Sequence, residues 1–138
     1  MGTFYTDCTI ANIANRAKAA TLPKFLVDTG SEHTWVPSAV LEQLNIRREK
    51  KDLTFTMANG QRVTRTVGFA VVEVGDEYTV DEVVFGEPGD MSLLGARSLE
   101  GLNLTVDPVR KKLVAAGPLP AATPRRVPSG KKKRGKSK

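Results

Sequence analysis

Hydrophobic and polar residues alternate along much of the chain, which is typical of β-strands with one buried face. The pattern is clear in residues 3–10, where every second residue falls on the same side: Phe4, Thr6, Cys8 and Ile10. Further short apolar or alternating runs occupy residues 24–27, 53–57, 62–74, 78–85, 93–94, 104–106 and 112–115. Residues 12–21 fit either a wide turn or a short helical insertion. Taken together, these runs predict an all-β body.

Two short segments have helical spacing instead. Residues 37–44 place Val40, Leu41 and Leu44 on one side of a helix, behind a proline of the kind tolerated in a first helical turn. A second short helix is expected from Ala96 to Gly101. Both helices are too brief to change the fold class.

Turn residues separate the predicted strands. Asn59-Gly60 lies between two extended runs and predicts a hairpin with a type I′ turn, in which both central residues need positive φ. Gly75-Asp76 predicts a second tight turn. Residues 87–90 (EPGD) are expected to form a loop, and Asp107-Pro108 a turn.

The composition changes sharply at Gly117. Four prolines follow within twelve residues, and residues 125–138 hold eight of the 21 Lys and Arg residues and no acid. Such a segment cannot bury enough apolar surface to offset the entropy of ordering it. We therefore expect one domain over residues 1–116 and a disordered tail, Pro-rich and then basic, over residues 117–138.

The charge distribution follows the same division. The formal net charge is +6, but without the tail's eight bases residues 1–124 hold 13 bases against 15 acids, a formal charge of −2. The basic character of the protein therefore belongs to the tail.

Several classes of protein are excluded by composition. One cysteine, Cys8, cannot form a disulfide within the chain, and one histidine, His33, cannot join it in a Cys/His zinc cluster. The first residues carry no basic segment followed by an apolar run, and no stretch approaches the roughly 18–20 apolar residues that span a bilayer. We expect a cytoplasmic protein with no metal and no cofactor.

One segment carries candidate chemistry. The apolar run Lys24–Val27 leads directly into Asp28-Thr29-Gly30, so a buried strand would deliver a carboxylate into a tight turn. Thr29 supplies a hydroxyl that can hold the turn, and Gly30 permits close approach of another backbone. The tripeptide alone does not decide the matter, because these are common turn residues.

The surroundings of this turn resemble aspartic proteases. Residues 28–38 (DTGSEHTWVPS) are similar to the active-site loop of the pepsin group. Residues 93–102 followed by Val106-Asp107-Pro108 resemble the end of single-domain retropepsin-like proteases, where two apolar residues and a glycine precede a short helix. The hairpin at Asn59-Gly60 lies between them, where that family has its flap. The resemblance covers about residues 3–115 and implies a retropepsin-like acid-protease fold: a small closed β-barrel lobe with a flap hairpin and one short C-terminal helix.

The single Asp-Thr-Gly implies a homodimer. Pepsin-like enzymes have two lobes that contribute one aspartate each, whereas this chain is about one lobe long. Acid–base hydrolysis by this mechanism needs two carboxylates that share a proton. The second carboxylate would be Asp28 of another copy, which a twofold axis brings opposite the first.

The implied activity is that of an aspartic endopeptidase acting on extended peptide or protein substrates. Asp28 would be catalytic, the active-site loop would continue through Thr29, Gly30 and Ser31, and Leu94 with Gly95 would support it. By resemblance, Thr29 would hydrogen-bond across the dimer interface and Gly30 would offer its backbone to the substrate. The substrate-binding flap would hold Met57, Ala58, Asn59 and Gly60.

Other functions stay open. The flap turn lacks the aromatic residue that many members of the family carry, so the fold could serve as a peptide-binding or dimerisation module with weak or absent catalysis. Cys8 with His33 could form a nucleophile dyad, although a cysteine in an alternating strand is more often a small core residue. Trp35 is interpreted as a core or pocket-wall residue.

The tail has three interpretations. It could be functionally silent, or it could bind nucleic acid or an anionic surface without sequence specificity. It could also be a localisation signal or a segment removed by processing. The tail has no aromatic residue, so base stacking is not indicated.

Overall fold

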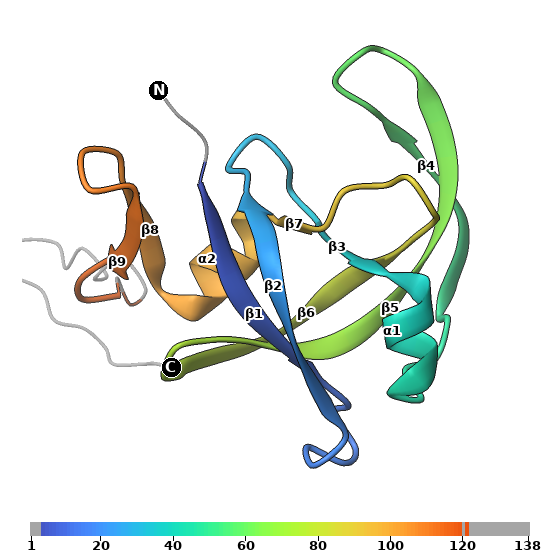
Figure 1. The fold of residues 1–138 in the computed structure, drawn as a ribbon, viewed down its shortest axis with the longest axis horizontal. Helices are drawn as coiled ribbons and strands as arrows, with labels where there is room; N and C mark the ends of the chain where they lie inside the picture. The colour runs from blue at the N-terminus through green and yellow to red at the C-terminus, as the bar shows by residue number, and fades with distance from the viewer. Residues whose placement is uncertain (1–3, 120, 122–138) are drawn as a thin grey trace, which may run out of the picture.

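A computed structural model of the protein describes residues 4–119 and 121, which fold mainly as β-strands (Figure 1). The strands are β1 (Tyr5–Ala11), β2 (Ala19–Val27), β3 (Thr34–Pro37), β4 (Lys50–Thr56), β5 (Arg62–Val74), β6 (Glu77–Gly86), β7 (Leu93–Leu94), β8 (Leu104–Asp107) and β9 (Lys112–Ala115). The helices are α1 (Ser38–Gln43) and α2 (Ala96–Leu102). The prediction of an all-β body is confirmed.

The main sheet closes on itself. Its strand order is β1-β2-β7-β3-β6-β5-β4, and β5 also pairs with β1. The length of β5 permits this, because its first half pairs with β4 while Val71–Glu73 pair with Thr9–Ala11 of β1. Strands β1, β2, β7, β3, β6 and β5 thus form a small barrel, and β4 extends beyond it. The closed barrel lobe expected from the resemblance is present.

The core fills the inside of this barrel. Alternate residues of β1, β5 and β6 point inward, as period-two strands require. The buried core residues are Cys8, Ile10, Phe25, Val27, Val36, Leu41, Leu44, Ile46, Ala70, Val72, Val83, Phe85, Leu94, Leu99 and Leu102. Both helices contribute to it, through Leu41 of α1 and through Leu99 and Leu102 of α2. At about 25 cal/mol per Å² of apolar surface removed from water, such a core is the main stabilising contribution to the fold.

Strands β8 and β9 form a separate two-stranded sheet beside α2, at the left of Figure 1. Leu104, Val106 and Leu113 of this hairpin are partly buried against the core. None of the described helices is long and apolar enough to cross a membrane.

The beginning of β2 differs from the sequence prediction. We expected a strand over residues 24–27, but β2 starts at Ala19 and includes Pro23. The pairing with β1 is interrupted where Pro23 and Lys24 stand opposite Asp7, and Lys24 has φ +63°. A bulge of this kind accommodates a proline that cannot donate to the ladder. Residues 12–18 form the turn before β2, so no helical insertion is present.

Two further details correct the predictions. Strand β3 was not expected, because four residues between a turn and a helix carry no periodic signal. The hairpin at Asn59-Gly60 is present, but its turn is not type I′: Gly60 has φ +86°, whereas Asn59 does not have positive φ. The Gly60 amide donates to Met57 O (2.8 Å), and the Met57 amide donates to Gln61 O (2.7 Å), so the loop is longer than two residues.

The predicted boundary at residue 116 and the disordered tail stay predictions. Residue 120 and residues 122–138 lie outside the described part of the chain.

Candidate active site

The strand before Asp28 is held on both sides. Phe25 and Val27 are buried in the core. The Val27 amide donates to Phe4 O (3.0 Å), and the Asp28 amide donates to Leu94 O (3.1 Å). Leu26 and Val27 pair with Leu93 and Leu94 of β7 in parallel. The backbone that carries the Asp28 carboxylate is therefore fixed by the barrel itself.

The turn after Asp28 is closed by its own side chain. Asp28 Oδ1 accepts a hydrogen bond from the Gly30 amide (3.0 Å), and Asp28 O accepts one from the Ser31 amide (3.1 Å). The Ser31 hydroxyl donates to His33 O (3.0 Å). Asp28 is half-buried, whereas Thr29 and Gly30 are exposed. The carboxylate is thus oriented while the outer part of the turn is open to a partner or a ligand.

The start of α2 supports this loop from behind. The Ala96 amide donates to Ser31 O (2.7 Å), and the Arg97 amide donates to Glu32 O (3.1 Å). A Cβ atom at Gly95 would lie 2.6 Å from the His33 carbonyl carbon and 2.8 Å from Glu32 O. Only glycine fits this close approach, which explains physically why a glycine follows Leu94.

A buried polar network joins the loop to α2 and β6. Thr34 and Ser98 are both fully buried, and their hydroxyl oxygens lie 2.6 Å apart. Thr34 Oγ1 accepts a hydrogen bond from the Gly95 amide (3.0 Å), and the Ser98 hydroxyl donates to Asp81 Oδ2 (2.8 Å). Because buried polar groups are costly unless paired, this chain of bonds holds the three elements in one arrangement.

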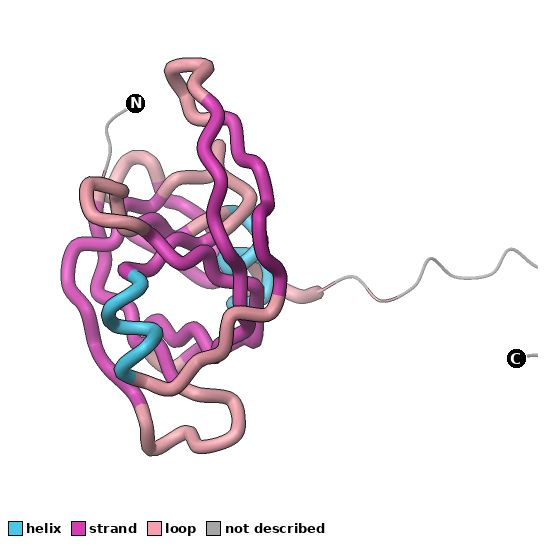
Figure 2. The backbone as a smooth tube through the Cα atoms, turned by 90° about the vertical axis from the view of Figure 1, so that its right-hand side faces the viewer, coloured by secondary structure: helices cyan, strands magenta, loops and turns pink. Residues whose placement is uncertain are grey.

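The hairpin predicted as the flap projects beyond the barrel at the same end as the Asp28 loop (Figures 1 and 2). Its base packs on a second cluster of buried residues, the hairpin cluster: Trp35, Val67 and Val84, with Leu53, Phe55, Met57, Val63 and Leu93 partly buried around them. Met57 therefore faces the barrel, whereas Ala58, Asn59 and Gly60 are exposed at the tip. The interpretation of Trp35 as a core or wall residue agrees with its place in this cluster.

The amino-acid sequence matches a known family. The model for the "gag-polyprotein putative aspartyl protease" family matches residues 18–101, which is more than half of the chain. The chain belongs to this family. A comparison with curated proteins finds no match. The matched segment runs from the turn before β2 into α2 and includes every predicted site residue. The described body is therefore a retropepsin-like aspartic protease domain.

The sequence analysis did not predict an ionic cluster that lies beside the Asp28 loop of this aspartic protease domain. Glu82 of β6 lies 2.7 Å from Lys50 Nζ, 3.1 Å from His33 Nε2 and 3.9 Å from a guanidinium nitrogen of Arg97. The hydrogen bond from Lys50 is the main reason that the pKa of Glu82 lies below its ordinary value. No sequence signal could have found this cluster, because its members are contributed by four different parts of the chain.

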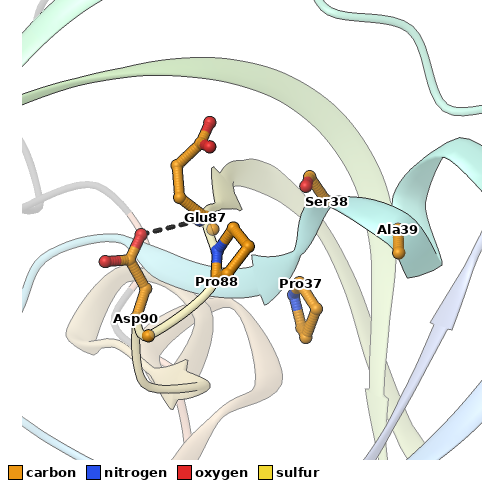
Figure 3. Close-up of a pocket in the computed structure, with 8 residues that line it drawn as sticks. Pro37, Ser38, Ala39, Glu87, Pro88 and Asp90 are labelled. Carbon is orange, nitrogen blue, oxygen red and sulfur yellow. Dashed lines mark hydrogen bonds between the residues drawn. The ribbon is translucent and has the colours of Figure 1, made fainter.

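A further ion pair joins β5 of the hairpin to the loop after β6. Arg65 Nε and Nη2 donate hydrogen bonds to the two carboxylate oxygens of Asp90 at 2.7 and 3.0 Å. Asp90 also accepts a hydrogen bond from the Glu87 amide (2.7 Å), as Figure 3 shows. The pKa of Asp90 is lowered, chiefly by the hydrogen bond from Arg65.

The same loop borders a pocket of about 280 Å³ (Figure 3). The pocket is lined by Pro37, Ser38, Ala39, Gly86, Glu87, Pro88, Gly89 and Asp90. None of the predicted site residues belongs to it. The Asp28 turn is therefore separate from this pocket.

The alternative of a Cys8–His33 dyad is wrong. Cys8 is buried, and burial raises the pKa of its thiol to about 12. The His33 ring contacts Glu82 instead. Residues 4–119 and 121 contain no group of three or more Asp, Glu, His and Cys side chains placed to hold a metal ion.

Proposed function

We propose that the protein is a homodimeric aspartic endopeptidase in which Asp28 of each subunit forms the catalytic pair. The observation that carries this proposal is the geometry of the turn. A barrel strand orients a half-buried Asp28 carboxylate, while the neighbouring Thr29 and Gly30 are exposed. Membership of an aspartyl protease family supports the proposal.

The need for a partner follows from what one subunit offers. Within the described residues, the Asp28 side chain has one hydrogen bond, from the Gly30 amide, and no second carboxylate bonds to it. A lone carboxylate cannot serve as acid and base in one step. The exposed turn can meet its own copy on a twofold axis, and this places two Asp28 side chains together.

In the proposed mechanism, one Asp28 carboxylate takes a proton from water as the water oxygen attacks the carbonyl carbon of the scissile bond. The other, protonated Asp28 donates a hydrogen bond to the carbonyl oxygen. The tetrahedral intermediate then collapses, the C–N bond breaks, and the leaving nitrogen receives a proton from the pair. Thr29 would join the two turns, and the hairpin tip at residues 57–60 would close over an extended peptide.

A second candidate is a peptide-binding or dimerisation module of the same fold. The hairpin tip supports weak or absent catalysis in such a module, because the exposed Ala58, Asn59 and Gly60 include no aromatic side chain to close over a substrate. We retain two further proposals for the whole chain: a cytoplasmic location, and nonspecific contact of the basic tail with nucleic acid or an anionic surface.

The test of catalysis is cleavage of a peptide library by the wild type and by Asp28→Asn across acidic to neutral pH. Asp28→Asn keeps the shape of the side chain and should lower kcat by about a thousandfold or more. Asp76→Asn, on the exposed turn between β5 and β6, is the matched control and should retain full activity. Cleavage that survives Asp28→Asn would remove Asp28 from the mechanism.

The test of the shared site uses mixed dimers. Wild type and Asp28→Asn protein are unfolded together in different ratios and refolded. If each site needs both Asp28 residues, activity should follow the square of the wild-type fraction. A linear dependence would show that one subunit suffices.

A further inference from the structure

The ionic cluster around Glu82 contains more hydrogen-bond donors than Glu82 uses. Lys50 donates to Glu82 Oε2, and His33 lies within hydrogen-bond distance of Oε1. The nearest Arg97 nitrogen lies 3.9 Å from Oε1, beyond hydrogen-bond distance. Among the described residues, no partner accepts a hydrogen bond from the Arg97 side chain, which is 46% exposed. The guanidinium, with its five N–H groups, is available to a ligand.

The carboxylates near this cluster do not occupy those donors. Asp81 accepts hydrogen bonds from the Ser98 hydroxyl and from the Glu82 amide. Glu32 is exposed and has no ion pair within the part of the chain that the structure describes. Glu82 itself is shared among three partners at 2.7–3.9 Å. An additional carboxylate from outside would find unused donors on Arg97 and on Lys50, whose side chain is 48% exposed.

The cluster lies where the active-site loop meets the predicted flap. His33 is five residues after Asp28, and its ring contacts the Phe55 ring edge-on, with centroids 5.4 Å apart. Phe55 belongs to β4, which ends at Thr56, directly before the hairpin tip begins at Met57. Arg97 is tied to the loop through its amide, which donates to Glu32 O. An extended peptide between the Asp28 turn and the hairpin would therefore pass beside these side chains.

We propose that Arg97 and His33, with Lys50 beside them, form a subsite that selects an acidic side chain of the peptide substrate. This inference rests on the proposed function, because it places the peptide between the Asp28 turn and the hairpin. The substrate carboxylate accepts charge-assisted hydrogen bonds from the Arg97 guanidinium, while the Phe55 and His33 rings contact its methylene groups. Arg97 and His33 are specificity-determining residues and take no part in bond breaking.

The experiment measures peptide binding and peptide cleavage separately. A library of octapeptides is prepared in which each position in turn is Glu, Gln, Lys or Leu. Immobilised Asp28→Asn protein captures peptides without turnover, and mass spectrometry measures enrichment at each position. The wild type is assayed for kcat/KM on the same peptides. At one position, Glu should be favoured over Gln by about tenfold or more in both measurements.

Charge variants identify the residue responsible. Arg97→Gln should bring the Glu-to-Gln ratio close to one, and Arg97→Glu should reverse the preference toward Lys. Arg110→Gln removes an equal charge from the turn between β8 and β9, where the side chain is 68% exposed, and should keep the wild-type ratio. Thermal unfolding of each variant verifies that it is folded.

The outcomes separate the two proposals. Acid enrichment in capture without cleavage by the wild type would support the subsite and overturn the endopeptidase. Cleavage or capture with no preference for Glu would overturn the subsite and leave the endopeptidase standing. A preference for Glu that Arg97→Glu does not alter would also overturn the subsite, as would failure of the immobilised protein to capture any peptide.

Discussion

The ion pair between Arg65 and Asp90 provides the sharpest stability prediction. It joins β5 of the hairpin to the loop after β6 through two bonds of 2.7 and 3.0 Å. The side chains are only 16% and 13% exposed. Asp90→Asn removes the charge and one of the matched acceptors while keeping the size of the side chain. Arg65 is then left partly buried without a full partner.

The magnitude lies between two known limits. Removing one partner of a fully buried pair costs about 3–5 kcal/mol, whereas an exposed pair contributes about 0–1 kcal/mol. Because Arg65 and Asp90 are largely but not wholly buried, we expect Asp90→Asn to lower the free energy of unfolding by about 2 kcal/mol. For a domain of this size, that corresponds to a fall in Tm of about 8 °C.

The effect should depend on pH. The pKa of Asp90 is lowered in the folded protein, chiefly by Arg65, so the charged carboxylate is favoured by folding. Its contribution is therefore full above the ordinary pKa of 3.8 and is lost as the pH falls through the lowered value. The difference in stability between wild type and Asp90→Asn should be largest near neutral pH and should vanish in strong acid.

The assay is urea unfolding, monitored by the fluorescence of Trp35. This residue is the single tryptophan, and it is buried. Wild type, Asp90→Asn, Arg65→Met and the double variant form a double-mutant cycle. We expect a coupling energy of about 1 kcal/mol or more at neutral pH. Asp76→Asn is the control for loss of a surface charge. A coupling energy below about 0.5 kcal/mol, or a difference that persists in strong acid, would refute the argument.

Three further predictions concern the support of the site and the core. Gly95→Ala should lower the free energy of unfolding in urea by about 3 kcal/mol, because the added Cβ atom would meet the backbone of residues 32 and 33. Gly89→Ala is the control: its Cβ atom would meet nothing within 4 Å, so only the φ of +96° should cost stability, by about 1 kcal/mol. Ser98→Ala should cost about 1–3 kcal/mol by the same measurement, because Thr34 and Asp81 lose their shared partner. Cys8 should not react with an aromatic disulfide reagent near pH 8 until the protein unfolds, because its thiol is buried with a pKa of about 12; rapid reaction of the folded protein would contradict this.

Much of the fold follows from local patterns. The alternation of apolar residues predicted the strands of residues 5–11, 62–74 and 77–86 closely, because a strand with one buried face has a period of two. The turn at residues 28–30 was predicted from its residue types. It is closed locally, because the Asp28 side chain accepts a hydrogen bond from the Gly30 amide. The two short helices were likewise predicted from spacing and turn residues. These features depend on neighbours in sequence.

Long-range contacts decided the rest. Pro23 alone argues against a strand, because proline has no backbone N–H to donate. It nevertheless lies in β2, since the pairing with β1 is interrupted by a bulge opposite Asp7. Strand β3 has four residues and is stabilised by its parallel pairing with residues 83–86, nearly fifty positions later. The turn at Asn59-Gly60 adopted a longer loop than the dipeptide favours in isolation, as the pairing of β4 with β5 allows.

The candidate site divides in the same way. By itself, the sequence determined the candidate Asp28 and its turn, because the Gly30 amide that closes the turn is only two residues away. The need for glycine at residue 95 is a tertiary effect, because a Cβ atom there would meet the backbone of His33 and Glu32. Only the tertiary structure decided which charges meet, since Glu82 gathers Lys50, His33 and Arg97 from separate elements. Ion pairs have no period along a chain, and their partners are chosen by how the barrel closes.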